Sequence, residues 1–255
     1  MPNIIEVNQL VKHYPGGDQP AVRGVSFAVR RGEVFGLLGP VGAGKTTLIS
    51  MLACLLKPGS GSATIAGFDL FRQPNDIKRR IRLVPQRPAL YPLLSIRDNL
   101  LLYGWLHGVN GRQLKPRVAE ALQLVGLDAC RCDRADKRAN GTQRRVSLAA
   151  ALLHQPEILL LDEPTVNVDP HSRTCILDTV AELNRRGLTV MYATHDSAAA
   201  ACLCHRIALI DLGRIVALDT PRALQDLLGS LAAREVLEPN LDAVFLALTG
   251  KRLQA

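Results

Sequence analysis

Short apolar runs alternate with turn residues along the first forty positions of the chain. The runs at 4–7, 22–29 and 34–38 each have the length and composition of a β-strand. A glycine-rich segment follows the third run. After it, residues 46–56 form a predicted helix that ends before Lys57-Pro58-Gly59, because proline and glycine interrupt regular structure. The pattern predicts strands first, and then a strand, a glycine-rich loop and a helix.

The middle of the chain changes to a helical pattern. Apolar residues recur at helical spacing from residue 95 to residue 125, which predicts a helical insertion. Continuous apolar runs return at 158–161 and 189–192, and a helix-like stretch at 172–184 joins them. This is the pattern of buried parallel strands connected by crossover helices.

The last segments complete the predicted fold. Residues 206–211 and 214–219 flank Leu212-Gly213, which predicts a hairpin, and helical spacing follows from Pro221 onward. We expect an α/β fold with a mainly parallel sheet, an N-terminal antiparallel β layer and a helical insertion between Gln86 and Arg145.

The charge balance raises the question of a nucleic-acid partner. The 255 residues carry a formal net charge of +8, and a basic field attracts nucleic acids, anionic membranes and phosphate ligands alike. Aromatic residues make up only 4% of the chain, however, so the stacking platforms of a single-strand binder are scarce. We therefore expect no nucleic-acid partner.

Location and redox state follow from two further observations. No run approaches the roughly 18 apolar residues of a membrane helix, and residues 1–6 lack the order of a secretory signal, so we expect a cytoplasmic protein. The six cysteines are then expected to be reduced. The Cys-x-Cys pairs at 130/132 and 202/204 lack the usual zinc spacing, so buried or incidental thiols are favoured over a soft-metal site.

The glycine-rich segment matches the pattern Gly-x4-Gly-Lys-[Ser/Thr]. It consists of Gly39, Pro40, Val41, Gly42, Ala43, Gly44, Lys45 and Thr46. The glycines let backbone N–H groups converge on phosphates, Lys45 supplies a charge, and the Thr46 hydroxyl is a magnesium ligand. A chance glycine-rich turn is disfavoured by the strand before the segment and the helix after it. The segment predicts a phosphate loop that binds ATP.

Two carboxylates at the end of an apolar strand supply the complementary half of such a site. Asp162 and Glu163 follow residues 158–161 directly. One carboxylate suits magnesium and the other suits orientation of an attacking water molecule. The structural alternative is that Glu163 only caps the turn at Pro164. With a phosphate loop upstream, the pair favours hydrolysis over simple binding.

With these motifs placed, nearly the whole chain resembles the ATP-binding subunit of an ABC transporter, which implies a P-loop NTPase fold of ABC type. The resemblance implies that Tyr14 stacks on adenine, that Thr47 joins the phosphate loop in binding ATP, and that His195 contacts the γ-phosphate. It also implies that Gln86 senses magnesium together with Thr46 and Asp162. Lys45, Glu163 and His195 would be the catalytic residues, and ATP and Mg²⁺ the cofactors.

Two segments resemble subunits that serve ABC-2-type exporters, a group that includes drug, polysaccharide and antibiotic export systems. They are residues 88–92 and residues 239–250. The resemblance implies an ATPase domain at 1–229 with a helical subdomain at about 88–145, and a short helical tail at 230–255. It also implies a separate membrane permease that chooses the substrate. The chain would lie peripherally on the inner face of the cell membrane.

The signature of the family is altered in this chain. Aligned on Arg144-Arg145, Ala139 replaces a serine and Asn140 replaces a glycine, while Gly141 is retained and Thr142 follows. In the family, two subunits pair head to tail, and the signature of one subunit faces the ATP held by the other. Asp169 matches an aspartate loop that reaches across this dimer interface. Ala139 cannot donate a side-chain hydrogen bond, and the Asn140 Cβ restricts close backbone approach. We expect a weakened signature, which would slow hydrolysis at both sites of a homodimer but leave one site normal if the chain pairs with a different ATPase subunit.

Two further departures also lie at the expected dimer interface. Val41 stands where an asparagine is frequent, and Asn167-Val168 precedes Asp169. The second ATPase subunit is either the same chain or a different one. Two alternatives to an exporter subunit remain open at this stage, namely an ABC ATPase that acts on a soluble partner and a slow regulatory ATP-binding subunit. The tail at 239–250 favours transport.

Overall fold

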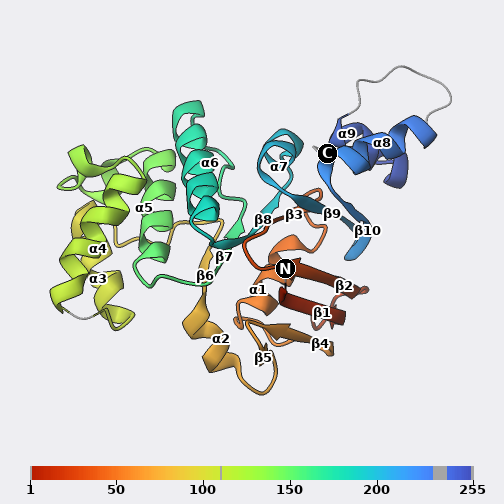
Figure 1. The fold of residues 1–255 in the computed structure, drawn as a ribbon, viewed down its shortest axis with the longest axis horizontal. Coiled ribbons are helices and arrows are strands. Elements are labelled where there is room, and N and C mark those ends of the chain that lie inside the picture. Colours follow the sequence, from red (N-terminus) through yellow and green to blue (C-terminus); the bar gives the residue numbers. More distant parts are fainter. Residues whose placement is uncertain (1, 110, 232–239, 254–255) are drawn as a thin grey trace.

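The computed structural model describes residues 2–109, 111–231 and 240–253 (Figure 1). Two sheets and the helices around them are built from these residues. The strands are β1 (Asn3–Lys12), β2 (Val22–Arg30), β3 (Val34–Leu38), β4 (Ser60–Ile65), β5 (Phe68–Asp69), β6 (Ile81–Val84), β7 (Ile158–Asp162), β8 (Thr189–Thr194), β9 (Arg206–Asp211) and β10 (Arg214–Asp219). The α-helices are α1 (Lys45–Leu52), α2 (Pro74–Arg80), α3 (Ile96–Leu106), α4 (Gly111–Leu124), α5 (Asn140–Leu152), α6 (Pro170–Arg185), α7 (Ser197–Leu203), α8 (Pro221–Leu231) and α9 (Leu241–Thr249), with 3₁₀ turns at Asp128–Cys130 and Ala135–Lys137.

The larger sheet is mainly parallel, as predicted. Its strand order is β10-β9-β3-β8-β7-β6, and only the pair β9–β10, the predicted hairpin, is antiparallel. The strands β3, β7 and β8 are buried at every position, which explains their continuous apolar sequences. Because β3, β7 and β8 are parallel neighbours, the loops that follow them meet at one edge of the sheet.

The smaller sheet is the predicted antiparallel layer, and two of its strands were not predicted. Its order is β2-β1-β4-β5. The apolar run at 4–7 continues as a strand to Lys12, past a bulge where Gln9 adopts a φ of +47° and the pairing shifts. The strand β4 has the sequence SGSATI, with small polar residues where the pattern of a strand needs apolar ones. Pairing with β1 organises this segment, and the local sequence does not.

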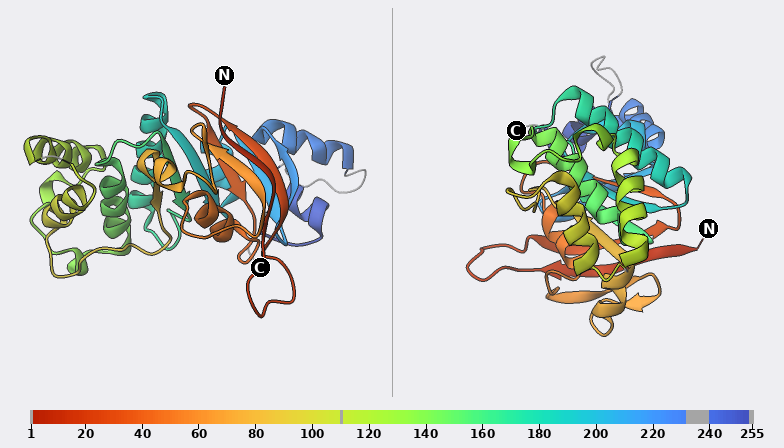
Figure 2. Two further views of the ribbon diagram at one scale, coloured as in Figure 1. Left: turned by 90° about the horizontal axis from the view of Figure 1, so that it is seen from below. Right: turned by 90° about the vertical axis from the view of Figure 1, so that its left-hand side faces the viewer.

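Helices α3, α4 and α5 form the predicted helical insertion, which projects from one end of the sheets (Figure 2). The predicted helix at 46–56 is shorter in the structure, because α1 ends at Leu52 and Cys54 turns into the left-handed region with a φ of +56°. Among the helices that the structure describes, none is both long and apolar enough to span a membrane.

Two hydrophobic clusters lie on opposite faces of the larger sheet. Phe35 and Leu37 of β3 point to the cluster shared with α1 and the antiparallel sheet, whereas Leu38 points to the cluster shared with α5, α6, α7 and α9. Alternate side chains of β7 divide in the same way. The sheet is therefore held rigidly between two apolar layers, and its strand ends are fixed in space.

The C-terminal helix α9 packs against α7 and α8. Val244 and Phe245 are fully buried there, and the Ser197 hydroxyl donates to the Asp242 carboxylate at 2.6 Å. Most of the segment 239–250 that resembles exporter subunits is this helix, while Pro239 lies outside the described residues. The segment is thus joined to the core close to His195.

Cys204, in the second Cys-x-Cys pair, lies in the core of the protein. Cys204 is buried against β3, and burial raises the pKa of its thiol to about 12. The neighbouring His205 accepts a hydrogen bond from the Val34 N–H at its Nδ1, 3.0 Å away. Within the described residues, no group of three or more potential metal ligands gathers. The geometry favours the interpretation of Cys204 as a core residue.

Candidate nucleotide-binding site

The phosphate loop connects β3 to α1 under tight backbone constraints. A Cβ atom at Gly39 would lie 2.2 Å from the carbonyl oxygen of Ile210, so no larger residue fits. Gly44 has a φ of +102°, and a Cβ there would lie 2.3 Å from the carbonyl oxygen of Ala21. These glycines let the loop turn sharply and bring the N-terminus of α1 to its centre, which is the geometry of an anion site.

Lys45 is buried in the mouth of this loop, with only 5% of its surface exposed. Its Nζ donates to the carbonyl oxygens of Gly39 at 2.6 Å and Pro40 at 2.9 Å, and it lies 3.2 Å from Glu163 Oε1. A buried ammonium group is stable only when it is paired and hydrogen-bonded in this way. The contacts aim the cation of Lys45 at the space where a phosphate chain would lie.

Thr46 and Asp162 form an oxygen-rich pair next to that cation. The Thr46 hydroxyl donates to Asp162 Oδ1 at 3.2 Å. Burial raises the pKa of Asp162, while the Thr46 hydrogen bond and the charges of Lys45 and Arg144 oppose the shift. A hydroxyl and a carboxylate are the hard oxygen donors that Mg²⁺ prefers, so the pair is chemically suited to that ion.

Glu163 and His195 come together although 32 residues separate them. Glu163 Oε2 lies 3.0 Å from His195 Nδ1. The Glu163 N–H donates to the carbonyl oxygen of Ala193 at 2.9 Å, and a φ of +49° at Glu163 turns its side chain out of the strand direction. A carboxylate directed by neighbouring β-strands can orient water or accept a proton.

Eight of the residues predicted from the sequence line one pocket. Its volume is about 170 Å³. It is lined by Ala21, Val41, Gly42, Gly44, Lys45, Thr46, Thr47, Gln86 and Glu163. Tyr14 lies at the edge of the loop, where its hydroxyl is 3.3 Å from Thr47 Oγ1 and the residue is 42% exposed. An exposed ring in this position is open to stacking.

Arg144 belongs to the surroundings of the site, although sequence reasoning used it only as a point of alignment. It is 5% exposed, and it donates to the carbonyl oxygen of Pro85 at 3.0 Å, which ties α5 to the segment that carries Gln86. Burial lowers the pKa of Arg144, and the nearby charges of Asp162 and Glu163 oppose that shift. A basic pair after a signature motif is the signal that could have identified it.

The altered signature, residues 139–142, opens α5 and does not line the phosphate pocket of its own chain. Ala139 is the N-cap of α5 and has no side-chain cap. A Cβ at Gly141 would lie 2.4 Å from Asp169 Oδ2 and from Ser172, so the helix N-termini of α5 and α6 touch at this glycine. Asp169 caps α6 by accepting from the Ser172 N–H at 2.9 Å.

The other two departures from the family pattern lie at the tip of the phosphate loop and just before α6. Val41 is 79% exposed at the tip of the phosphate loop. Asn167 adopts a φ of +54°, a left-handed conformation that asparagine tolerates better than other residues with a Cβ. Asn167 therefore allows the chain to turn into the cap of α6 without a glycine.

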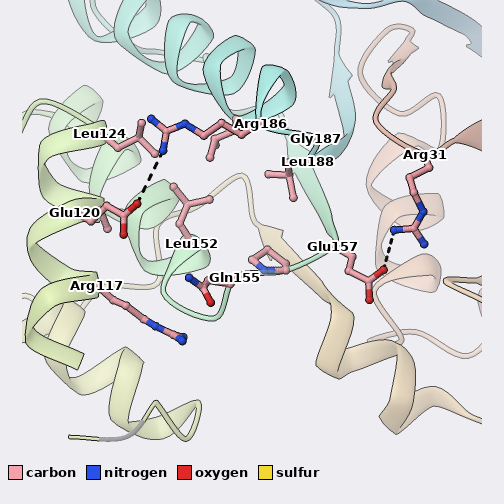
Figure 3. A pocket seen from close by; sticks show the side chains of 13 residues that line it. Arg31, Arg117, Glu120, Leu124, Leu152, Gln155, Glu157, Arg186, Gly187 and Leu188 are labelled. Carbon is pink, nitrogen blue, oxygen red and sulfur yellow. Dashed lines mark hydrogen bonds and ion pairs between the residues drawn. The ribbon is translucent and has the colours of Figure 1, made fainter. Parts of the chain in front are cut away.

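A second cavity, of about 420 Å³, lies at the other end of β7, between α4, α5 and α6 (Figure 3). Its arginines already have partners, because Arg31 pairs with Glu157 at 3.0 Å and Arg117 donates to the carbonyl oxygen of Leu153 at 3.1 Å. It contains no part of the phosphate loop and none of the residues predicted for the site. It is separate from the nucleotide pocket.

Comparisons with known proteins agree with this geometry. The family model described as "ABC transporter" matches residues 22–166, and a model described as "AAA domain, putative AbiEii toxin, Type IV TA system" matches residues 139–201. The linearmycin resistance ATP-binding protein of Bacillus subtilis is 39% identical over 243 residues, which cover 95% of this chain and 78% of that protein. The Nod factor export ATP-binding protein I of Paraburkholderia xenovorans is 37% identical over 86% of this chain and 72% of its own length.

A solved structure is similar over nearly its whole length. It is an ATP-binding cassette in a dimeric post-hydrolysis state bound to ADP and Pi, with a TM-score of 0.77 and 27% identity over 85% of this chain and 98% of that chain. The relatives share both the fold and the class of site described above. The chain belongs to the ABC transporter family, as one of its ATP-binding subunits that hydrolyse ATP.

Proposed function

We propose that the chain powers export through a separate membrane permease of the ABC-2 type. The observation that carries the proposal is the meeting of two buried side chains, Lys45 and Glu163, with the partly buried His195 beside the phosphate loop. Such a cluster is built for turnover, because a binding module has no need of a carboxylate directed at the phosphate site. The name of the Paraburkholderia relative, which specifies Nod factor export, supports the direction of transport.

The predicted site residues then have the following roles in the reaction. The loop amides and Lys45 bind the phosphate chain of ATP, and Tyr14 stacks on the base. Thr46, Asp162 and Gln86 would hold Mg²⁺, which would supply charge neutralisation at the phosphates. Glu163 orients the attacking water and accepts its proton, while His195, fixed by the Glu163 carboxylate, contacts the terminal phosphate.

A second ATPase subunit, identical or different, completes the site. The signature at the start of α5 leaves its own phosphate pocket open, which is expected if it serves another chain. The exposed tip at Val41 provides a contact for such a partner. The dimeric state of the similar cassette supports this assembly.

A groove beside β6 is a suitable docking surface for the permease. Leu55, 68% exposed, and Leu106, 53% exposed, line this groove of about 480 Å³ between β6 and α3, and Trp105, 69% exposed, precedes Leu106 in α3. Basic side chains of Lys78, Arg79 and Arg82 line the same groove. Exposed aromatic and aliphatic groups of this kind mark protein interfaces. A permease bound there would hold the chain peripherally at the inner membrane face.

The Glu163→Gln variant tests the proposal. We expect phosphate release from the chain assembled with its permease to fall by two orders of magnitude or more, roughly the cost of removing a general base, while ATP binding is retained. Equal rates in the variant and the native chain would contradict the catalytic role of Glu163. The identity of the co-purifying partner tests the transport role separately, because a soluble partner would exclude it.

A further inference from the structure

An ion pair joins the first turns of α6 and α7. Arg173, one turn into α6, pairs with the Oδ2 atom of Asp196, which is the N-cap of α7. The other carboxylate oxygen of Asp196 accepts the Ala199 N–H at 3.0 Å, so Asp196 caps its own helix and binds a second helix at the same time. The start of α7 is therefore tied to the start of α6.

The position of Arg173 is unfavourable for α6 by itself. The Arg173 N–H donates to the carbonyl oxygen of Asp169, the N-cap of α6, at 2.9 Å, so the side chain leaves the helix close to its N-terminus. The N-terminal end of a helix carries a partial positive charge, which repels a cation. The Asp196 carboxylate offsets this repulsion. The arginine is thus suited to holding α7 rather than to stabilising α6.

The ion pair acts on the turn that carries His195, because Asp196 follows the histidine directly. The Asp196 N–H donates to Thr194 Oγ1 at the end of β8, 2.9 Å away. His195 Nδ1 lies 3.0 Å from Glu163 Oε2, and its side chain is 29% exposed. The end of β8 supports the turn on one side and Arg173 supports it on the other. The direction of the imidazole depends on both supports.

The start of α6 also touches the altered signature. A Cβ at Gly141 in α5 would lie 2.4 Å from Asp169 Oδ2 and from Ser172, and Arg173 is the next residue of the chain. The first turn of α6 therefore lies between the signature on one side and the His195 turn on the other.

We infer that Arg173 is a positioning residue for ATP hydrolysis, which holds the His195 turn against the start of α6. Because Asp169 is expected at the interface with a second subunit, the arginine ties the position of His195 to that interface. A guanidinium group suits this role, because it stays charged and its planar N–H groups fix the direction of the carboxylate that it binds. The inference rests on the proposed contact of His195 with the terminal phosphate.

The test compares the ATPase kinetics of the full chain, assembled with its permease, for variants at both ends of the ion pair. Arg173→Ala should lower kcat about tenfold and change the KM for ATP less than about twofold, because a small misplacement of a reacting group slows the reaction while the phosphate loop is untouched. Asp196→Asn keeps an oxygen for the Ala199 N–H and should cause the same loss. The double variant should lose no more than either single variant, and Arg173→Lys should recover part of the rate.

A spectroscopic readout separates positioning from a general effect on folding. In the full chain with isotope-labelled histidine, the ring signal of His195, identified by its loss in His195→Gln, should shift or broaden in Arg173→Ala. The melting temperature should fall by no more than about 4 °C, because a partly exposed ion pair contributes little to stability. Arg185→Ala is the matched control, since it removes an arginine at the other end of α6 that pairs with Glu182 at 2.6 Å. It should change neither the rate nor the His195 signal.

A native kcat in Arg173→Ala, or a lower kcat with an unchanged His195 signal, would overturn the inference. An equal loss of rate in Arg185→Ala would also overturn it, since that result indicates a general effect on α6. His195→Ala separates the inference from the proposed function. A native rate in His195→Ala would remove the proposed role of the histidine and the inference with it, whereas a slow His195→Ala beside a native-rate Arg173→Ala would overturn the inference alone.

Discussion

At the scale of single residues, Asp162 shows that the site is maintained at the expense of stability. Burial raises the folded-state pKa of Asp162 above its value in the unfolded chain. Folding therefore favours the protonated carboxyl, and the contribution of this group to stability falls as the pH rises from about 3.8 through the folded-state pKa. At neutral pH the native chain carries the full cost, about 1.4 kcal/mol for each pH unit that separates the folded-state and unfolded-state pKa values.

Asp162→Asn should accordingly raise the melting temperature of the nucleotide-free chain by roughly 2–4 °C for each kcal/mol that is relieved. The same variant should lose the further stabilisation that Mg²⁺ and ATP give to the native chain, because it lacks a charged ligand for the ion. Thermal unfolding at pH 7 with and without Mg-ATP measures both effects. Asp18→Asn, at an exposed position, is the control. A lower melting temperature for the nucleotide-free Asp162→Asn chain would contradict this account.

The signature offers a second prediction at this scale. Ala139→Ser places a hydroxyl at the N-cap of α5, where the extended backbone (φ −57°, ψ 156°) suits a capping serine. The single variant should be stabilised by about 1 kcal/mol. Together with Asn140→Gly, it should also raise the ATPase rate of the assembled complex severalfold. Unfolding and phosphate release are measured on the same samples, and a stabilised double variant with an unchanged rate would contradict the weakened signature.

Several candidate residues lie next to apolar runs. Asp162 and Glu163 follow the run at 158–161 and His195 comes shortly after the run at 189–192, whereas the glycine-rich pattern marks Lys45. Arg144 follows no such run, because its place at the site depends on how α5 packs against the segment after β6. Long-range packing of this kind is not encoded in a local pattern.

At the scale of elements, the contact between α5 and α6 gives Gly141 a role inside the chain. Gly141→Ala would push a methyl group to within 2.4 Å of Asp169 and Ser172, and relieving that overlap should cost about 1–3 kcal/mol. Gly111→Ala in α4 is the matched control, because no atom lies within 4 Å of the place that its methyl group would take, and it should be neutral or slightly stabilising. Chemical denaturation measures the free energy of unfolding of the Gly141→Ala and Gly111→Ala variants. Equal values for the two variants would contradict the close contact at Gly141.

Elements with their own apolar pattern were predicted well, and elements that depend on a neighbour were not. The strands β3, β7 and β8 and the hairpin of β9 and β10 match the predicted runs to within two residues. The strand β4 and the helix α2 were missed, because their polar sequences become regular only against β1 and β6. The early end of α1 depends on the left-handed turn at Cys54, which no glycine marks.

At the scale of the whole molecule, the nucleotide site and the docking groove are connected through one segment. The strand β6 carries Arg82 in the groove, and Gln86 in the phosphate pocket follows four residues later. Arg144 holds the intervening Pro85 through its carbonyl oxygen at 3.0 Å. Residues 82–86 therefore form a direct physical link between the phosphate pocket and the proposed docking groove, and a link of this kind is what the coupling of ATP hydrolysis to transport requires.

The groove yields the last prediction. Trp105→Ser combined with Leu106→Ser removes exposed apolar area and no buried contact, so the isolated chain should keep its melting temperature and its basal ATPase rate. Affinity purification from detergent-solubilised membranes of the natural host should lose the membrane partner, because in the proposed docking these side chains would supply the apolar centre of the interface. Val216→Ser, at an exposed position of β10, should retain that partner. Retention of the membrane partner by the double variant would place the docking surface elsewhere on the molecule.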